Sequence, residues 1–570
     1  MNNKKQNLKQ NKEENIPYMG GEVKTATLDN GAIVNQGLAI PKRGAKIDKI
    51  RDGITVLKRF SLDNTVIIEG KEGVIVWDTG GHMEAGKRKY RALREITNKP
   101  VKAIIYSHNH YTMGAKAFIP EGENGKEIQI ISHPNVHKNI TDTAIELDPA
   151  TTRNGAMHFG SYLPSTGPDA HFQSEAEEGS KTGYIEPTYS VQDGEEMDID
   201  GVEMQFFYTP SDTYDSLTLW LPNYDTVITN SIWNVFPNMY TLRGQPYRDP
   251  KDWIKGIDII RELNPQYLIP EHGNARRTKE ESYQLATNYR DGMAFIYSHA
   301  VRGINKGLKP DEIADSLELP EHLANHPWLS ESYGELKHHV KGIYSGLIGW
   351  FSLDAADINP VSIPFRSERI AKGFGGTNKI IDLSNQALED KEYAWAAELI
   401  THVLNIDPDN KKARQIKANA LRQLGYTTPA SSSRGFYLTQ ALALEGKVDL
   451  NQTPQGLTGL GDDGIEKLPV DQMMKLLEFK INPVSAMNTD KVVAIILTDL
   501  KQSFGLHVRK GVAEVSNYKP KKFDITIELS SELWKGIVLG KIKIEDAVSQ
   551  EQINSSDIKG TIPFFNLFDL

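Results

Sequence analysis

Two histidines separated by one residue, directly after a short apolar run, constrain this chain more than any other feature. Residues 101–105 are expected to form a short buried strand, and His108 and His110 follow it closely. In α/β proteins the loops at the carboxyl ends of strands build the functional sites. Two imidazoles at positions i and i+2 just past a strand end can reach the same metal ion. The pattern predicts a metal site in an α/β fold.

The composition limits the chemistry of such a site. The chain has no cysteine, which excludes disulfides, thiolate metal ligands and thiol nucleophiles. Any metal must therefore be held by His, Asp, Glu or Asn side chains. The net charge of −10 gives no overall reason to bind nucleic acid, so no nucleic-acid partner is expected.

The length of 570 residues predicts several domains, because single cores rarely exceed about 300 residues. Glycine clusters near residues 373–376 and 456–464 are the expected boundaries. The expected order is a disordered arm (1–20), a catalytic domain (21–365), a helical domain (366–450) and a small α+β domain (464–570).

Periodicity and turn residues place the main elements. Strands are expected at 54–60, 65–69, 74–77, 101–106, 202–209, 217–221, 226–229 and 267–269, with helices at 84–96 and 251–263. Residues 140–195, rich in Gly, Pro, Thr and Ser, are expected to form a long insertion or lid. Helices at 378–390, 392–404, 411–424 and 435–443 are typical of helical hairpins, which need a neighbouring domain or subunit to bury their apolar faces.

The start of the chain has no apolar segment of the kind found in signal peptides. No run of about 18 apolar residues occurs, so no membrane span is expected. The expected location is cytoplasmic as the sequence stands, and periplasmic or secreted only if an export signal was removed.

Several segments in a fixed order resemble the alkylsulfatases of the metallo-β-lactamase superfamily over nearly the whole chain. They are Asn64-Thr65, Val74 to Thr79, His108-x-His110, Tyr208-Thr209-Pro210, Asn238 to Gly244 with Arg248-Asp249, His338 to Tyr344, and Trp395 to Leu399. The resemblance implies an αββα catalytic domain, a helical dimerisation domain that forms a homodimer, and a C-terminal domain resembling sterol carrier protein 2.

The resemblance also implies a metal centre from which ligands have been lost. Typical members hold two zinc ions with a His-x-His-x-Asp-His motif, two glutamates and one late histidine. His108 and His110 match the first pair, but Thr112 and Met113 stand where the aspartate and the third histidine belong.

The remaining ligands are matched less closely. Asp212 is nearest to the first glutamate, Asn230 falls on the glutamate that bridges the metals, and His272 corresponds to the late histidine. The expected metal ligands are therefore His108, His110, Asp212 and His272, with Asp212 and His272 as catalytic residues.

This donor set favours one metal ion over two. Two histidines and a carboxylate with open positions suit zinc, and iron is the second possibility. Two alternatives stay open: a metal-free relic in which the histidines only hydrogen-bond nearby loops, and a site that still holds two ions.

The anion-binding side matches the family better. The resemblance assigns the head group of the substrate to Arg243 and its partner His338, with Tyr240 as a further contact. A guanidinium offers a rigid fork of donors suited to a tetrahedral oxyanion. The alternatives are that Arg243 pairs with Asp249 and that Tyr240 is a core residue.

The leading hypothesis is an alkylsulfatase-like, metal-dependent hydrolase of the sulfuric-ester type, acting on a small amphiphilic substrate with an anionic, sulfate-like head. One alternative is a metal-free pseudoenzyme that binds anionic amphiphiles. Another is a metal-dependent lyase or esterase that acts on a different substrate.

Overall fold

The structure of the chain is a computed structural model. It describes residues 45–119, 127–164, 167–171, 182–233, 235–452, 454 and 464–570, together with the two-residue strands β1 (Ala26–Thr27) and β2 (Ile33–Val34). The expected disordered arm, residues 1–20, lies outside the described residues.

The first large sheet carries the histidine motif. Its seven strands lie in sequence order from β3 to β9. They are β3 (Lys46–Arg51), β4 (Ile54–Lys58), β5 (Thr65–Glu69), β6 (Val74–Trp77), β7 (Val101–Ile105), β8 (Gln129–Ser132) and β9 (Tyr189–Ser190). The pairs from β3 to β6 are antiparallel, and those from β6 to β9 are parallel. Helix α2 (Met83–Ile96) connects the parallel strands β6 and β7.

The second sheet has five strands in sequence order. They are β10 (Glu196–Ile199), β11 (Val202–Tyr208), β12 (Leu217–Leu221), β13 (Thr226–Thr229) and β14 (Tyr267–Pro270). One buried apolar cluster contains side chains of both sheets, among them Ile105, Phe206 and Leu219. The two sheets therefore face each other across a shared core, as in a β-sandwich.

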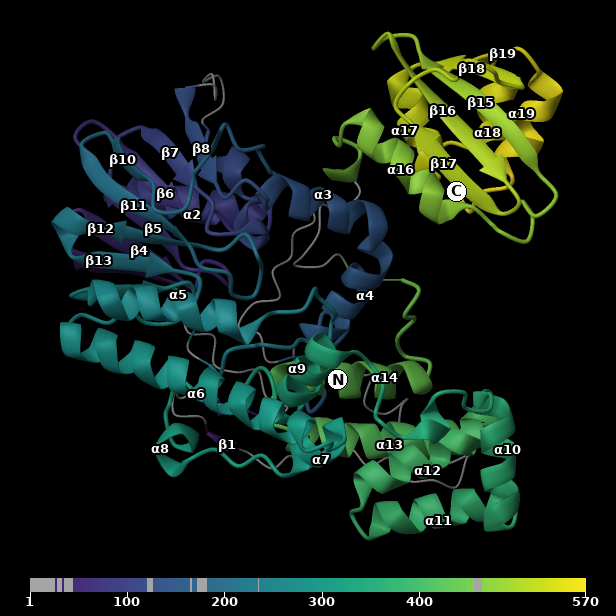
Figure 1. Ribbon diagram of the computed structural model, residues 1–570, viewed down its shortest axis with the longest axis horizontal. Helices are drawn as coiled ribbons and strands as arrows, with labels where there is room; N and C mark the ends of the chain where they lie inside the picture. Colours follow the sequence, from purple (N-terminus) through teal and green to yellow (C-terminus); the bar gives the residue numbers. More distant parts are fainter. Residues whose placement is uncertain are drawn as a thin grey trace. The chain divides into compact units, whose positions relative to one another are not determined.

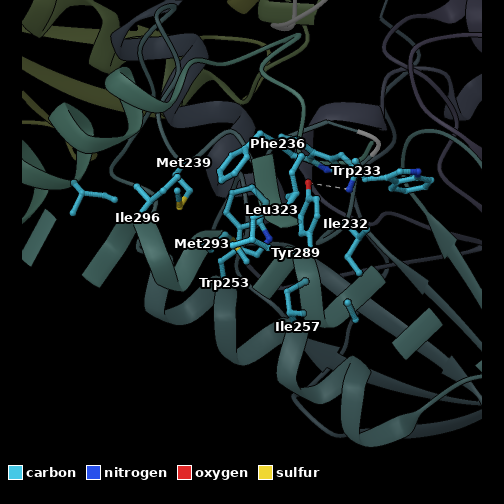
Figure 2. Packing of buried hydrophobic residues seen from close by; sticks show 14 of the residues in the cluster. Ile232, Trp233, Phe236, Met239, Trp253, Ile257, Tyr289, Met293, Ile296 and Leu323 are labelled. Carbon is cyan, nitrogen blue, oxygen red and sulfur yellow. Dashed lines mark hydrogen bonds between the residues drawn. The ribbon is translucent and has the colours of Figure 1, made fainter. Parts of the chain in front are cut away.

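Helices cover the outer side of the second sheet. Helices α5 (Pro250–Leu263) and α6 (Lys279–Asn305) run side by side next to the strands (Figure 1). They share a second core with Trp233, Phe236 and Met239, in which the hydroxyl of Tyr289 accepts a hydrogen bond from the Trp233 amide (Figure 2). With α2 beside the first sheet, the predicted αββα sandwich is confirmed.

The region expected to be a long insertion contains two helices, α3 (Val136–Glu146) and α4 (Asp148–His158). The Gly, Thr and Pro content of residues 140–195 concealed them, because α4 has almost no apolar stripe to mark it. Burial of Ala156, Met157 and His158 shows that tertiary packing stabilises the end of α4.

The predicted helical region is present. It comprises α10 (Ile363–Phe374), α11 (Thr377–Glu389), α12 (Tyr393–Ile406), α13 (Lys411–Thr427) and α14 (Ser431–Leu444). These helices enclose an apolar core that includes Ile380, Leu399 and Ile416. Shorter helices precede them: α7 (Pro310–Asp315), α8 (Glu321–Ala324) and α9 (Leu336–Ile348).

By its internal contacts the chain divides into two compact units, residues 1–136 with 150–458, and residues 137–149 with 459–570. The second unit contains a five-stranded sheet ordered β17-β16-β15-β18-β19. Its elements are α16 (Val470–Lys480), β15 (Asp490–Leu497), β16 (Gln502–Arg509), β17 (Val512–Ser516), β18 (Ile525–Leu529), α17 (Ser531–Val538), α18 (Ile544–Ser549), β19 (Asn554–Ser555) and α19 (Ile558–Phe565). Phe564, Phe565 and Phe568 are buried and stack edge to face, so they belong to the core of this unit.

Among the described residues, no helix is both long enough and apolar enough to cross a membrane.

Candidate metal centre and anion site

The loop after β7 is held by a buried carboxylate at the end of the neighbouring strand. Oδ1 of Asp78 accepts a hydrogen bond from the Ser107 amide at 2.8 Å. The backbone of Asp78 has φ of 56°, a left-handed conformation that is uncommon for a residue with a side chain. The short 3-10 turn Asn109–Tyr111 then directs the chain across the sheet edge. Asp78 therefore anchors the base of the histidine loop.

Three side chains from two sheets meet beyond this loop. Ligand atoms of His108, His110 and Asp212 all lie within 4.8 Å of one another. Nδ1 of His110 is 3.2 Å and Nε2 of His108 is 3.8 Å from Oδ2 of Asp212. Nε2 of His108 is fully buried and has no hydrogen-bond partner among the described residues. A buried, unpartnered nitrogen facing a carboxylate fits a metal ligand, so these residues suit a bound divalent ion.

The protonation of the three groups also suits metal binding. Burial lowers the pKa of His108 to about 3, so its imidazole is neutral near pH 7. Burial likewise lowers the pKa of His110. Burial alone would raise the pKa of Asp212, but His108, His110 and Arg248 together hold it well below its usual value. Neutral imidazoles and an ionised carboxylate are the forms that bind a metal.

Hydrogen bonds fix the orientation of two of these groups. The Ser107 hydroxyl lies 2.6 Å from Nδ1 of His108, which leaves Nε2 to face Asp212. Nδ2 of Asn230 donates to Oδ1 of Asp212 at 2.7 Å. Asn230, the residue expected at the place of the bridging glutamate, is therefore a support of the Asp212 carboxylate. Such outer contacts orient metal ligands and tune their affinity.

His272 lies outside the group formed by His108, His110 and Asp212. Its Nδ1 is 2.9 Å from the Leu62 carbonyl and must carry the proton there. Its Nε2 is 3.4 Å from the hydroxyl of Tyr111, which can only donate to that nitrogen. Thr112 is fully buried, and the sulfur of Met113 accepts a hydrogen bond from the Thr182 hydroxyl at 3.0 Å. The Tyr111 phenol therefore occupies the one ring nitrogen of His272 that could otherwise bind a metal.

A second group of buried ionisable side chains lies on the His272 side of the site. Burial, with the nearby Asp63, raises the pKa of Asp78 to about 7. Burial and the charge of Asp78 also raise the pKa of Glu271, which hydrogen-bonds to Asp78. The carboxyl groups of Asp78 and Glu271 therefore share a proton near neutral pH. Beside them, the ammonium of Lys89 lies 2.5 Å from Asp63, and both side chains are fully buried.

Two buried guanidinium groups lie near the ligand group. Arg243 is 6% and Arg248 is 4% exposed, and both lower the pKa of His110. Nη1 of Arg248 donates to the Asn238 carbonyl, while its Nε and Nη2 have no partner among the described residues. Nε of Arg243 is likewise unpartnered there. Burial lowers the pKa of Arg248 only to about 10, so it stays charged. Charged donors left open in a buried site are suited to an oxyanion.

The other two residues expected to bind substrate differ in their surroundings. Tyr240 is 41% exposed and packs against Gly342, where an added Cβ would lie 2.6 Å from the Tyr240 Cβ. Nδ1 of His338 lies 3.6 Å from a carboxylate oxygen of Glu335. The next residue, His339, is fully buried, stacks on Phe236, and has no hydrogen-bond partner for either ring nitrogen among the described residues.

Sequence reasoning missed several residues that surround the centre. The sequence did point to the region of Arg248, because this residue belongs to a segment that resembles the family. Ser107 and Tyr111 were visible only as neighbours of the histidines. No pattern in the sequence pointed to His158 and Tyr333. In the structure Nε2 of His158 is 2.8 Å from the Tyr333 hydroxyl, and the charges of Arg243 and Arg248 help to lower the pKa of His158 and oppose the rise in that of Tyr333. Only the tertiary fold brings these distant segments together.

Three family models match successive parts of the chain. Residues 60–272 match the family model of the metallo-beta-lactamase superfamily. Residues 309–447 match the model for alkyl sulfatase dimerisation, and residues 459–569 match the alkyl sulfatase C-terminal model.

Curated relatives extend over most of the chain. It is 31% identical over 534 residues to the linear primary-alkylsulfatase of Pseudomonas sp. (strain ATCC 19151), covering 88% of this chain and 98% of that protein. It is 26% identical over 538 residues to the alkyl/aryl-sulfatase BDS1 of Saccharomyces cerevisiae, covering 91% and 82% of the two chains.

A solved structure has the same fold. The inverting sec-alkylsulfatase Pisa1 from Pseudomonas sp. superposes with a TM-score of 0.84 at 24% identity, over 97% of this chain and 92% of that one. The expected resemblance is confirmed: the chain belongs to the alkylsulfatase family of the metallo-β-lactamase superfamily.

Proposed function

We propose that this protein hydrolyses sulfate esters of amphiphilic alcohols with a single metal ion, zinc or iron, held by His108, His110 and Asp212. The observation that carries the proposal is the convergence of these three side chains beside the two buried arginines. The relatives named as alkylsulfatases support the choice of a sulfate ester. When bound, a divalent ion at such a site lowers the pKa of a coordinated water and polarises an oxygen of the substrate.

The chain's own residues would bind and orient the head group. Arg243 and Arg248 supply positive charge and open N–H donors to the three outer oxygens of a sulfate. Their burial excludes water and strengthens these contacts. We favour His339 over His338 as the histidine that partners the head group. His339 is buried, and the charge of Arg248 helps to lower its pKa, after burial itself.

His272 is proposed as a proton acceptor rather than a ligand. Its Nδ1–H is fixed on the Leu62 carbonyl and its Nε2 accepts the hydrogen bond of the Tyr111 hydroxyl, so a proton would reach Nε2 through that hydroxyl. Burial lowers the pKa of His272, so the ring is neutral near pH 7. A neutral imidazole with one fixed nitrogen can accept a proton at the other.

Metal analysis of the purified protein, combined with an assay of sulfate release from dodecyl sulfate, tests the proposal. About one zinc or iron per chain is expected, and His108→Ala should lose both the metal and the activity. His322→Ala, at an exposed histidine outside the site, is the matched control and should keep both.

Other outcomes would identify the alternatives. A protein without metal, whose thermal stability does not change in chelator, would be a binding pseudoenzyme. A metal-loaded protein that cleaves only phosphate or carboxylate esters would be an esterase. Two ions per chain would contradict the proposed role of Tyr111 and Asn230.

The arginines provide a separate test. Arg248→Gln removes a charged donor and should reduce kcat/KM for dodecyl sulfate by about 10- to 100-fold, the loss expected for one charge-assisted hydrogen bond. The metal content should not change. Loss of metal without a change in kcat/KM per metal-loaded site would contradict the assignment.

A further inference from the structure

One end of the C-terminal sheet carries apolar side chains that no described element covers. Their exposed fractions run from 41% to 82%, which is high for large apolar residues. They are Val484, Met487, Val512, Tyr518 and Phe523. Exposed single apolar residues need no explanation, but several on one end of a sheet do.

Backbone hydrogen bonds bring the first three together. The loop after α16 carries Val484 and Met487, and the turn between β16 and β17 leads into Val512. The Lys510 amide donates to the Thr489 carbonyl at 2.8 Å, and the Gly511 amide donates to the Ala486 carbonyl at 3.1 Å. The loop and the turn therefore form one continuous surface.

The loop between β17 and β18 adds the other two. It crosses the sheet at Gly505, where an added Cβ would lie 2.6 Å from Cγ of Pro520. It then returns to the start of β15, where the Asp524 amide donates to the Val492 carbonyl at 2.8 Å. Phe523 precedes that bond, and Lys519 lies 5.1 Å from the centre of its ring. The loop thus crosses the sheet and leaves Tyr518 and Phe523 exposed on it.

Exposed lysines surround the apolar side chains. They are Lys491, Lys510, Lys519, Lys521 and Lys522, and no ion pair involves them among the described residues. We name these five lysines and the five apolar residues the basic–apolar face.

The acidic side chains near this face have other partners. Asp490 is 2.9 Å from His507, and Glu514 is 2.6 Å from Arg509. Oδ2 of Asp524 accepts a hydrogen bond from the Val492 amide at 2.7 Å. The five lysines and Arg509 outnumber these three carboxylates, so the face keeps an excess of positive charge on a chain whose net charge is −10.

The charge of the face selects among possible occupants. A second copy would place five lysines against five lysines, and the family model for dimerisation matches residues 309–447, outside this face. An anionic surface with an apolar interior complements both the lysines and the side chains they surround. We propose that the basic–apolar face docks on the surface of an anionic lipid bilayer. Docking there does not depend on the proposed reaction.

Cosedimentation of the full-length protein with vesicles tests this proposal. Binding is expected to vesicles of phosphatidylcholine mixed equally with phosphatidylglycerol, and not to pure phosphatidylcholine. The triple variant K519E/K521E/K522E should weaken binding by about 100-fold or more, since each lysine near an anionic surface contributes roughly fivefold. Met487→Ser with Tyr518→Ser should also weaken it by removing inserted apolar area.

The triple variant K475E/K543E/K559E is the matched control, because it makes the same charge change at exposed lysines of the same unit outside the face. It should bind as the unchanged protein does. Equal binding to neutral vesicles, no binding, or full binding by K519E/K521E/K522E would overturn the proposal. So would a change in subunit number in that variant, which would place the face between copies of the chain. Circular dichroism checks folding, and loss of wild-type binding at high salt gives an independent readout.

Discussion

At the scale of single residues, the candidate site depends on groups that orient its ligands as much as on the ligands. Ser107 fixes one nitrogen of His108, and Asn230 fixes one oxygen of Asp212. Each is buried, so water cannot replace the lost hydrogen bond without cost. Asn230 and the buried acids Asp78 and Glu271 each lead to a prediction.

The first concerns Asn230. Asn230→Ala leaves Asp212 free to rotate, and we expect zinc affinity to fall by about 10- to 100-fold. Competition with a chelator measures the affinity directly. Asn378→Ala, at an exposed position of α11, should leave it unchanged. An unaltered affinity in Asn230→Ala would show that Asp212 is oriented by other contacts.

The second concerns the buried acids Asp78 and Glu271. Burial raises the pKa of both, that of Asp78 to about 7, so the folded protein holds protons that the unfolded chain releases near pH 4. The stability that this pair contributes is therefore full below about pH 4 and is lost as the pH rises toward about 7. Glu271→Gln cannot ionise and should lose less stability over that window. Tm should thus rise relative to the unchanged protein as the pH increases, and a constant difference would contradict the shared proton.

At the scale of elements, the histidine loop is positioned by a close approach of backbone to helix. Gly86 of α2 faces the loop at Gly114, and a Cβ on Gly86 would lie 2.3 Å from the Gly114 carbonyl oxygen. A Cβ on Gly114 would lie 2.1 Å from the Thr79 carbonyl oxygen. Helix, loop and the end of β6 are therefore packed without room for side chains, which fixes where His108 and His110 lie.

This packing predicts the effect of one methyl group. Gly86→Ala should destabilise the protein by about 1–3 kcal/mol through overpacking and should weaken metal binding by displacing the loop. Gly373→Ala is the matched control, because that helical glycine has no atom within 4 Å of an added Cβ. The control should gain roughly 0.5–1 kcal/mol. Urea unfolding of both variants measures the difference, and equal stability would contradict the close approach.

At the scale of the whole molecule, an exposed apolar segment leads into the helical region. The region 347–365 holds several exposed apolar side chains: Leu347, Ile348, Trp350, Leu353, Ile358, Val361, Ile363 and Phe365. Trp350 is 73% and Ile358 is 65% exposed. The segment lies within the part of the chain that matches the dimerisation model. We propose that it forms the contact between two subunits.

Ile358→Asp should therefore shift the protein from dimer to monomer, because a buried, unpaired carboxylate opposes association. Light scattering after size exclusion measures the molar mass. Leu500→Asp makes the same change at an exposed leucine of the C-terminal unit and should leave the mass unchanged. A dimeric Ile358→Asp protein, or a monomeric unchanged protein, would contradict the proposed contact.

The sequence by itself determined most strands of the two sheets, since period and turn residues are local signals, and its resemblance to a known family predicted the sandwich. Strands 65–69, 74–77, 217–221 and 226–229 begin and end where they were predicted. Helix α4 was missed because its sequence has almost no apolar stripe and its stability comes from tertiary contacts, whereas α3 was missed although its sequence carries an ordinary apolar stripe.

Only the tertiary structure decided how the site is completed. It placed Arg248, His158 and Tyr333 around the histidines and set Tyr111 on His272, because these contacts join segments far apart in the chain. The pKa shifts of Asp78 and Glu271 likewise arise from burial, which no local pattern records. Ligand identity can be read from a motif, but ligand geometry and charge depend on the packing around it.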